Sequence, residues 1–249
     1  MQQYSGFAYL YDLFMDGVDY DAWAKYLASF IPASARVLEC GCGTGEITLR
    51  LKKMGFDITA SDISPDMLAV ASEKARPCGL RIPFLQTDMR CLSFPKRFDA
   101  VIAPCDRVNY LTSLHDAERF FSSAYSVLKD GGRLIFDISS RYKLEKVLGF
   151  NTFSDIREEA CYIWKNNYDC ESKLIEMQLE FFKLESRQNG GKALYERFSE
   201  RHVQRAHSER ELRFRLERVG FSDIRVFAGI TENEPDSGSE RLHFVAKKQ

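Results

Sequence analysis

Three glycines at every second position are the residues of this sequence that most directly indicate a bound ligand. Gly41, Gly43 and Gly45 lie in the stretch VLECGCGTGEITLRL (37–51), between an apolar run and a helical pattern. Glycine loses more conformational freedom on folding than any other residue, so three in one turn need a compensating role. A glycine-rich turn between a strand and a helix brings backbone N–H groups close to a ligand. The stretch therefore predicts a ligand that contacts the main chain itself.

The spacing of these glycines argues against a nicotinamide or flavin dinucleotide. The fingerprint of such sites is G-x-G-x-x-G. Counted from Gly41, the sixth position is Glu46, and no shifted frame restores the pattern. A nicotinamide-dependent oxidoreductase is therefore disfavoured, whereas a sheet whose glycines only make a turn stays open as an alternative.

Two acidic residues follow the glycines, each at the end of an expected strand. Asp62 stands 21 residues after Gly41, and Asp88 lies in QTDMR (86–90). A carboxylate in the first of these places can accept two hydrogen bonds from the diol of a ribose. The pattern E-x-G-x-G-x-G (39–45), followed by these two acids in order, resembles class I S-adenosylmethionine (SAM)-dependent methyltransferases over residues 36–140.

The resemblance implies SAM as the cofactor and assigns its contacts. The glycine loop would pack against the methionine part, Asp62 would bind the ribose, Asp88 the adenine amino group, and Ile63 would lie against the adenine face. The full set of cofactor residues that it implies is Tyr11, Glu39, Gly41, Cys42, Gly43, Gly45, Asp62, Ile63, Met67, Asp88, Met89 and Cys105.

Methyl transfer is an in-line displacement, so it depends on orientation and on the exclusion of water. A base is needed only for some acceptors. The resemblance places APCDRVNYL (103–111) beneath the sulfonium, where Asp106 and Tyr110 are the catalytic candidates and Asn109 a substrate contact. Asp106 fits the role of a turn or cap residue equally well. The loop lacks Asn-Pro-Pro-Tyr, which argues against methylation of DNA bases or glutamine.

The N-terminal stretch FAYLYDLFM (7–15) places Phe7, Tyr11 and Phe14 on one helical face. The chain is also similar to glycine N-methyltransferase and to macrolide amino-sugar N-methyltransferases. In those enzymes an N-terminal segment with a Tyr-Asp pair folds over the cofactor, and a β insert follows the fifth strand. Tyr11 and Asp12 match the pair, so we expect Tyr11 to contact SAM or close the pocket as a catalytic residue.

Strands alternating with helices must position these residues. The alternation predicts an α/β fold: a doubly wound, seven-stranded Rossmann-like sheet with a C-terminal antiparallel hairpin. The expected strands are 36–40, 56–62, 81–88, 97–104, 133–139, 221–230 and 241–248, and the expected helices are 46–55, 64–75, 115–132 and 208–220.

The pattern changes after Ser140. Residues 158–206 contain three segments of period-2 alternation, which predict a small antiparallel β insert of three strands. We expect residues 1–140 and 207–249 to form the SAM-binding domain, with 1–30 as a helical lid, and 141–206 to form a subdomain over the acceptor. Trp164, His202 and Arg205 are the candidate acceptor contacts in it, although a strand without function could carry the same residues.

Composition and charge limit the classes of binding partner that we expect. The chain has 249 residues and a net charge of −1, without the basic excess that is typical of nucleic-acid binders. Seven scattered cysteines, no signal peptide and no long apolar run favour a cytoplasmic protein without a membrane or metal partner. A homodimer is left open.

The hypothesis is a SAM-dependent methyltransferase of a small molecule. An RNA or protein methyltransferase and a non-catalytic SAM-binding module are its alternatives.

Overall fold

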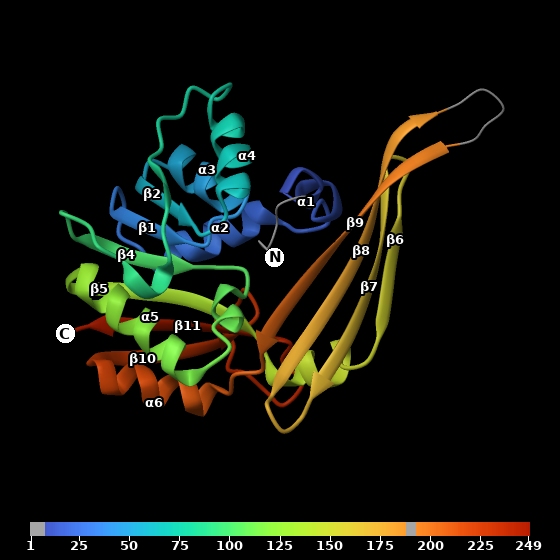
Figure 1. Ribbon diagram of the computed structural model, residues 1–249. Helices are drawn as coiled ribbons and strands as arrows, with labels where there is room; N and C mark the ends of the chain where they lie inside the picture. Colours follow the sequence, from blue (N-terminus) through green and yellow to red (C-terminus); the bar gives the residue numbers. More distant parts are fainter. Residues whose placement is uncertain (1–7, 188–192) are drawn as a thin grey trace.

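The computed structural model describes residues 8–187 and 193–249, and it contains two sheets (Figure 1). The larger has seven strands in the order β10-β11-β5-β4-β1-β2-β3. Strands β1 to β5 run parallel, whereas β11 lies antiparallel between β5 and β10. This confirms the doubly wound α/β sheet and its C-terminal hairpin. Its strands are Arg36–Cys40 (β1), Asp57–Asp62 (β2), Phe84–Gln86 (β3), Phe98–Ala103 (β4), Leu128–Ser139 (β5), Phe221–Ala228 (β10) and Arg241–Lys248 (β11).

Helices cover both faces of this sheet, which explains why its central strands are continuous apolar runs. Helices α2 and α3 pack with one face in a cluster that includes Leu27, Leu51 and Ile58. Helices α5 and α6 pack with the other in a cluster that includes Phe120 and Leu212. In Figure 1 these two layers lie above and below the sheet. The helices are Ala8–Phe14 (α1), Tyr20–Ser29 (α2), Glu46–Lys53 (α3), Pro65–Ala75 (α4), Leu114–Val127 (α5) and Glu209–Val219 (α6); the shorter turns are Met89–Cys91 (η1), Arg107–Tyr110 (η2) and Lys143–Leu148 (η3).

Two predicted elements, and the strand that follows the first of them, have other boundaries in the structure. The helix expected over 115–132 ends at Val127, because Leu128 turns into extended backbone and pairs with Phe98 as the start of β5. The strand expected over 81–88 is only Phe84–Gln86. Asp88 therefore lies beyond the strand, at the N-cap of η1, where its side chain accepts a hydrogen bond from the Arg90 N–H.

The insert is a separate antiparallel sheet of four strands, one more than predicted, in the order β6-β7-β8-β9. The additional strand β6 pairs with β7 along its whole length. Period-2 alternation in a stretch of five residues is too short to stand out from the loop around it. The strands are Thr152–Ile156 (β6), Ala160–Asp169 (β7), Leu174–Arg187 (β8) and Ala193–Arg205 (β9).

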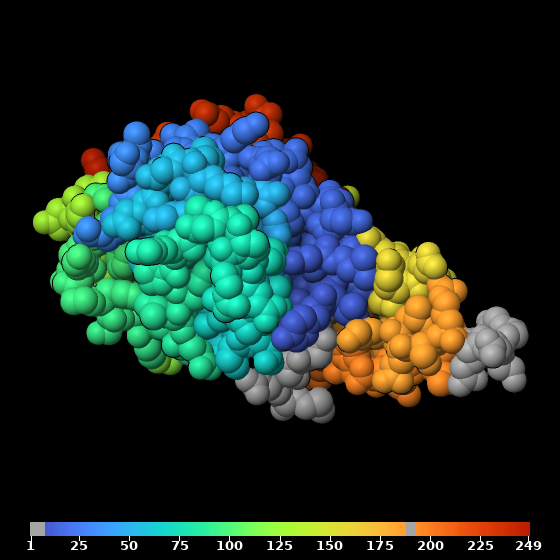
Figure 2. All heavy atoms as spheres, turned by 90° about the horizontal axis from the view of Figure 1, so that it is seen from above, coloured from blue at the N-terminus to red at the C-terminus, as the bar shows by residue number. Residues whose placement is uncertain are grey.

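Helix α1 lies between the larger sheet's helices and the insert (Figure 1), and Figure 2 shows its atoms in contact with both. On one side Asp12 accepts hydrogen bonds from Thr44 Oγ1 (2.6 Å) and from Lys74 Nζ (2.7 Å). On the other side Phe14 packs edge-on against Tyr162 of β7, and Arg157 forms an ion pair with Asp16. The helix is therefore attached to both parts of the molecule.

Candidate active site

The residues with candidate chemistry gather where the strand order reverses, between β1 and β4. In open parallel sheets this crevice, at the carboxyl ends of the strands, is where ligands bind. The glycine loop follows β1, Asp62 ends β2, and Cys105 follows β4. The topology therefore brings three distant segments to one place.

The three glycines have different structural roles. A Cβ on Gly41 would lie 2.8 Å from Cγ of Arg107, and one on Gly43 would lie 2.9 Å from Nη2 of the same side chain. A Cβ on Gly45 would instead lie 3.0 Å from Cβ of Ala71, in helix α4. All three have positive φ, at 70°, 54° and 81°. Gly41 and Gly43 thus leave room for the Arg107 side chain against the loop, whereas Gly45 allows α3 and α4 to pack closely.

Asp62 is buried and is held by the main chain. Its Oδ2 accepts a hydrogen bond from the Gly43 N–H (2.8 Å), and its Oδ1 accepts one from the Ser64 N–H (2.9 Å). These bonds fix the carboxylate beside the glycine loop. Each oxygen keeps a second lone pair, so the carboxylate can accept hydrogen bonds from two further hydroxyls.

Asp88 is engaged by the guanidinium of Arg90. Its Oδ2 lies 2.6 Å from Arg90 Nη2, and Oδ1 accepts from the Arg90 backbone N–H at 2.8 Å. The hydrogen bonds from Arg90 hold the pKa of Asp88 below its ordinary value. The carboxylate is therefore an anionic acceptor at the outer end of the site.

The turn after β4 is strained. Cys105 and Asp106 both have positive φ, at 61° and 54°, in a region that non-glycine residues rarely adopt. The Asp106 N–H donates to Asp137 Oδ2 (3.0 Å), and the buried Asp137 pairs with Arg241. Such strain persists only where the surroundings hold it, and it is concentrated at functional sites.

Two cavities open at this crevice, and the side chain of Arg107 separates them. One, of about 240 Å³, lies over the acids and is lined by Gly41, Asp62, Ile63, Thr87, Asp88, Met89, Arg90, Arg107, Tyr110 and Leu111. The other, of about 20 Å³, lies under α1 and is lined by Tyr11, Tyr20, Glu39, Gly41, Cys42, Thr44, Glu46, Ile47, Pro104, Cys105 and Arg107. We call them the outer and the inner cavity.

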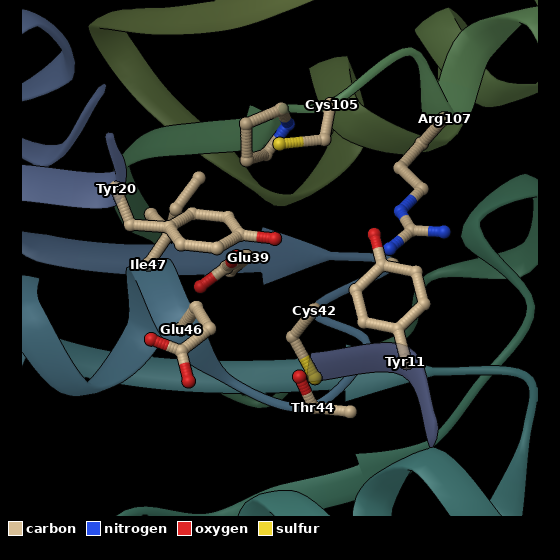
Figure 3. A pocket seen from close by; sticks show the side chains of 11 residues that line it. Tyr11, Tyr20, Glu39, Cys42, Thr44, Glu46, Ile47, Cys105 and Arg107 are labelled. Atoms are coloured by element: carbon tan, nitrogen blue, oxygen red, sulfur yellow. The ribbon is translucent and has the colours of Figure 1, made fainter. Parts of the chain in front are cut away.

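The inner cavity has an unusual set of ionisable groups. Burial raises the pKa of Glu39 to about 7, although a hydrogen bond from Thr48 and the charge of Arg107 oppose this. Burial also raises the pKa of Tyr20, whose hydroxyl interacts with Tyr11. Figure 3 shows both phenol oxygens and the Arg107 guanidinium converging on the cavity.

The thiols of the site are unsuited to nucleophilic catalysis. Burial raises the pKa of Cys42 and of Cys105 well above that of an ordinary thiol, so both stay protonated at neutral pH. A protonated buried thiol packs as a small apolar group. The site therefore offers no cysteine for a covalent intermediate.

Asn109 is buried in the loop that follows β4. It was expected to contact an acceptor, but it is fully buried, and its amide serves the backbone. Nδ2 donates to the carbonyl oxygens of Ser139 (3.0 Å) and Arg205 (2.9 Å), while Oδ1 accepts from the Ser139 N–H (2.9 Å). Asn109 therefore fastens η2 to β5 and to the end of β9.

Besides Asn109, Asp106 and His202, three predicted side chains line neither cavity. Met67 is buried in the cluster between α1, α4 and the insert, and Trp164 packs against Phe153 and the cluster that includes Leu144 and Leu148. Arg205 donates to the Ser172 carbonyl oxygen (3.1 Å) and lies 3.7 Å from Glu211, which ties β9 to the β7–β8 turn and to α6. Their positions indicate that they support the site rather than contact a ligand.

His202 lines neither cavity, but it lies next to a residue that lines one. It is buried on β9, and its Nδ1 lies 3.4 Å from the hydroxyl of Tyr110, which lines the outer cavity. Its Nε2 lies 3.9 Å from Glu200 Oε2. Burial and the charge of Arg107 lower the pKa of His202 to about 4, so the imidazole is neutral at pH 7. A neutral imidazole can accept a proton that passes through the phenol.

Comparison with known proteins identifies the family. A profile described as "Methyltransferase domain" matches residues 37–132, from β1 to the start of β5. The chain is 39% identical to the Bacillus subtilis protein named as methyltransferase YqeM, over 98% of this chain and 97% of that one. The chain belongs to the SAM-dependent methyltransferases. A SAM-dependent methyltransferase of Clostridium acetobutylicum has the same fold, with a TM-score of 0.85, 29% identity and 98% coverage of both chains.

A more distant relative has a known acceptor. The glycine/sarcosine N-methyltransferase of Aphanothece halophytica is 29% identical, over 86% of this chain and 76% of that one. The cofactor of this methyltransferase is SAM, and the site fits it. A bare glycine loop stands beside a buried carboxylate with free lone pairs, and acids and phenols surround a cavity next to it.

Sequence reasoning missed several residues of this site. Arg107, Tyr20, Thr44 and Thr87 line the cavities, but none of them stands at a position that the recognised pattern specifies. Arg107 carried one signal, since it directly follows Asp106 in the loop after the fourth strand. Tyr20 is brought in only by the packing of α2 against α3.

Proposed function

We propose that this methyltransferase transfers a methyl group to a small-molecule acceptor enclosed between α1, the insert and the carboxyl ends of the strands. The observation that carries the proposal is the clamped position of α1. Asp12 fastens it to Thr44 and Lys74 beside the glycine loop, and Arg157 fastens it to the insert. A site covered by α1 in this way suits an acceptor small enough to be enclosed.

The surface of the insert supports the same choice. Its outward arginines are paired with acids on the neighbouring strand, as Arg201 is with Glu176 and Arg197 with Glu180. Paired charges of this kind do not form the free basic strip that RNA binding needs. Similarity to a glycine/sarcosine N-methyltransferase points to a small acceptor as well.

We assign the cofactor's parts as follows. Asp62 would bind the ribose diol, Ile63, Asp88 and Met89 would surround the adenine in the outer cavity, and the methionine part would enter the inner cavity beneath Tyr11. When bound, SAM supplies an electrophilic methyl group on a positive sulfonium. The acceptor would approach from the side of Tyr110 and His202.

The residues of the chain orient the acceptor and keep water away. Tyr11 and Tyr20 lie over the inner cavity, and Asp106 is held by Ser139 Oγ (3.1 Å) and by Gln204 Nε2 (3.3 Å). Asp106 is an anionic acceptor beside the transfer line, able to orient an N–H or O–H of the acceptor. Tyr110 and the neutral His202 provide the route by which that proton leaves.

The proposal is tested with SAM labelled in its methyl group. The purified protein is incubated with cell extract separated into small molecules, RNA and protein, and the fraction that gains label is identified. We expect label in the small molecules, and its loss with Asp62→Ala. Label that enters only RNA or protein would contradict the proposal, and label in none would favour a non-catalytic SAM-binding module.

A further inference from the structure

The inner cavity is too small for the group that the proposed function places there. At about 20 Å³ it holds about one water molecule, whereas the methionine part of SAM has nine non-hydrogen atoms including its sulfur. Some wall of the cavity must therefore move when the cofactor binds. The strands and the glycine loop are fixed by backbone hydrogen bonds, such as that from the Cys42 N–H to the Ser61 carbonyl oxygen (2.9 Å).

Arg107 is a wall that can move while α1 and the strands stay in place. Its side chain lies along the loop, with Cγ against Gly41 and Nη2 against Gly43, and it lines both cavities. Rotation about its side-chain bonds joins the two cavities and changes no backbone. The backbone that carries it is fixed, because Asn109 and Asp137 bind the loop on either side of it.

Charge indicates where the guanidinium goes. Among the described residues that line the inner cavity, Arg107 is the single arginine or lysine, beside the acids Glu39 and Glu46. The methionine part brings an ammonium group, for which Glu39 is suited because Glu46 already pairs with Lys74 and Arg50, and a carboxylate, for which neither acid is suited. A guanidinium binds a carboxylate through two parallel hydrogen bonds, and the hydroxyls of Tyr11 and Tyr20 can add others.

We propose that Arg107 is the residue that recognises the carboxylate of the cofactor, and that it leaves the glycine loop to do so. In this structure the guanidinium covers Gly41 and Gly43 and acts electrostatically on the buried Glu39. When the cofactor enters, the guanidinium moves off the loop and pairs with the carboxylate. This inference rests on the proposed placement of the cofactor, and it adds Arg107 to the binding residues.

Two adenosine ligands separate this role from others. S-Adenosylhomocysteine carries the amino and carboxylate groups, whereas 5′-methylthioadenosine has the same neutral sulfur and adenosine without them. Calorimetric titration measures both ligands against the wild-type chain, Arg107→Ala and Arg107→Lys. Arg187→Ala serves as a control, because Arg187 is exposed at the end of β8, pairs with Glu158 and lines neither cavity.

We expect Arg107→Ala to lower the affinity for S-adenosylhomocysteine at least about tenfold. The affinity for 5′-methylthioadenosine should equal that of the wild type or exceed it, because the variant leaves the space over the glycine loop empty. Arg107→Lys keeps the charge but not the bidentate geometry, so it should lower the affinity for S-adenosylhomocysteine less than the alanine variant does.

Two results would overturn the inference. If Arg107→Ala lowered the affinity for both ligands equally, Arg107 would only support the fold. If it raised the affinity for both ligands equally, Arg107 would only obstruct the site. Melting temperatures without ligand show whether each variant is folded. Failure of the proposed placement is seen separately, since the wild-type chain would then bind neither ligand.

Discussion

At the scale of single residues, the glycine loop combines a ligand surface and a packing contact within five positions. Gly41 and Gly43 face the side chain of Arg107, whereas Gly45 faces Ala71. The same spacing thus serves two purposes, and a side chain at each position would cause a different failure.

Gly45→Ala should lower the stability of the fold. The new Cβ would lie 3.0 Å from Cβ of Ala71, and alanine at a φ of 81° is strained as well. We expect the free energy of unfolding to fall by about 1–3 kcal/mol. Urea unfolding measures this. The matched control is Gly17→Ala, because Gly17 has no neighbour within 4 Å of the new Cβ; an equal loss in both variants would refute the packing role.

Asp62→Asn should weaken SAM binding at least about tenfold. The carboxylate oxygens accept from the N–H groups of Gly43 and Ser64, and an amide replaces one of these acceptors by a donor. Titration calorimetry gives the affinity. Asp57→Asn is the control, because Asp57 is exposed at the opposite end of β2. Unchanged SAM affinity in Asp62→Asn would remove this residue from the site.

At the scale of elements, helix α1 has little structure of its own and depends on its attachments. It has seven residues, which is too short for an isolated helix to be stable in water. Its position comes from Asp12 on the side of the glycine loop and from contacts of Phe14 and Asp16 on the side of the insert. Loosening either side should open the roof of the site without unfolding the sheet.

Asp12→Ala should speed the dissociation of SAM. The change removes the acceptor for Thr44 and Lys74, while Lys74 keeps its ion pair with Glu46. The loss of stability should stay below about 1 kcal/mol, as is usual for partly exposed pairs. Dissociation is followed by displacement with excess S-adenosylhomocysteine. Asp21→Ala, which loses an exposed pair with Arg50, is the control. A dissociation rate like that of the wild type would show that Asp12 does not hold the roof.

At the scale of the whole molecule, burial has shifted the pKa values of several groups in opposite senses. The pKa values of His202, His207 and His243 are lowered to about 4, and desolvation is the first cause in each. A histidine of this kind contributes stability that is lost as the pH falls from about 6.5 through 4. Glu39, with its pKa raised to about 7, contributes stability that is lost as the pH rises from about 4.5 through 7. Between about pH 4.5 and 6.5, where both effects act, the three histidines change the free energy of unfolding more than Glu39 does.

The free energy of unfolding should therefore fall on acidification from pH 7 to pH 5, and His243→Phe should reduce that slope. Both ring nitrogens of His243 lack a hydrogen-bond partner among the described residues, and the ring packs between Trp23 and Tyr26. Asp137 raises its pKa and Arg241 lowers it, but burial dominates.

Urea unfolding at pH 5, 6 and 7 measures this slope. One fully linked proton corresponds to about 1.4 kcal/mol per pH unit. His115→Gln is the control, because His115 is exposed at the start of α5. A slope in His243→Phe equal to that of the wild type would show that His243 is not linked to folding.

The sequence was sufficient for the order of elements in the larger sheet and for the position of Asp62 at the end of β2, but not for Asp88, which lies beyond β3. The sheet's strands are apolar runs, and its helices carry their own signals, such as Ser64 at an N-cap and Gly220 at a C-terminus. Errors occurred where tertiary pairing competes with local pattern. Leu128 joins β5 because Phe98 lies beside it, and β6 forms because β7 offers an edge.

What the sequence by itself determined is the order of elements and the glycine-acid pattern, because both are local properties of the chain. What only the tertiary structure decided is which side chains face the site. Asn109 looked available for an acceptor, yet it bonds to the backbone of Ser139 and Arg205, residues 30 and 96 positions away. Arg107 looked ordinary, yet it covers the glycines. Contacts between distant segments depend on how the layers pack, and no periodicity along the chain encodes them.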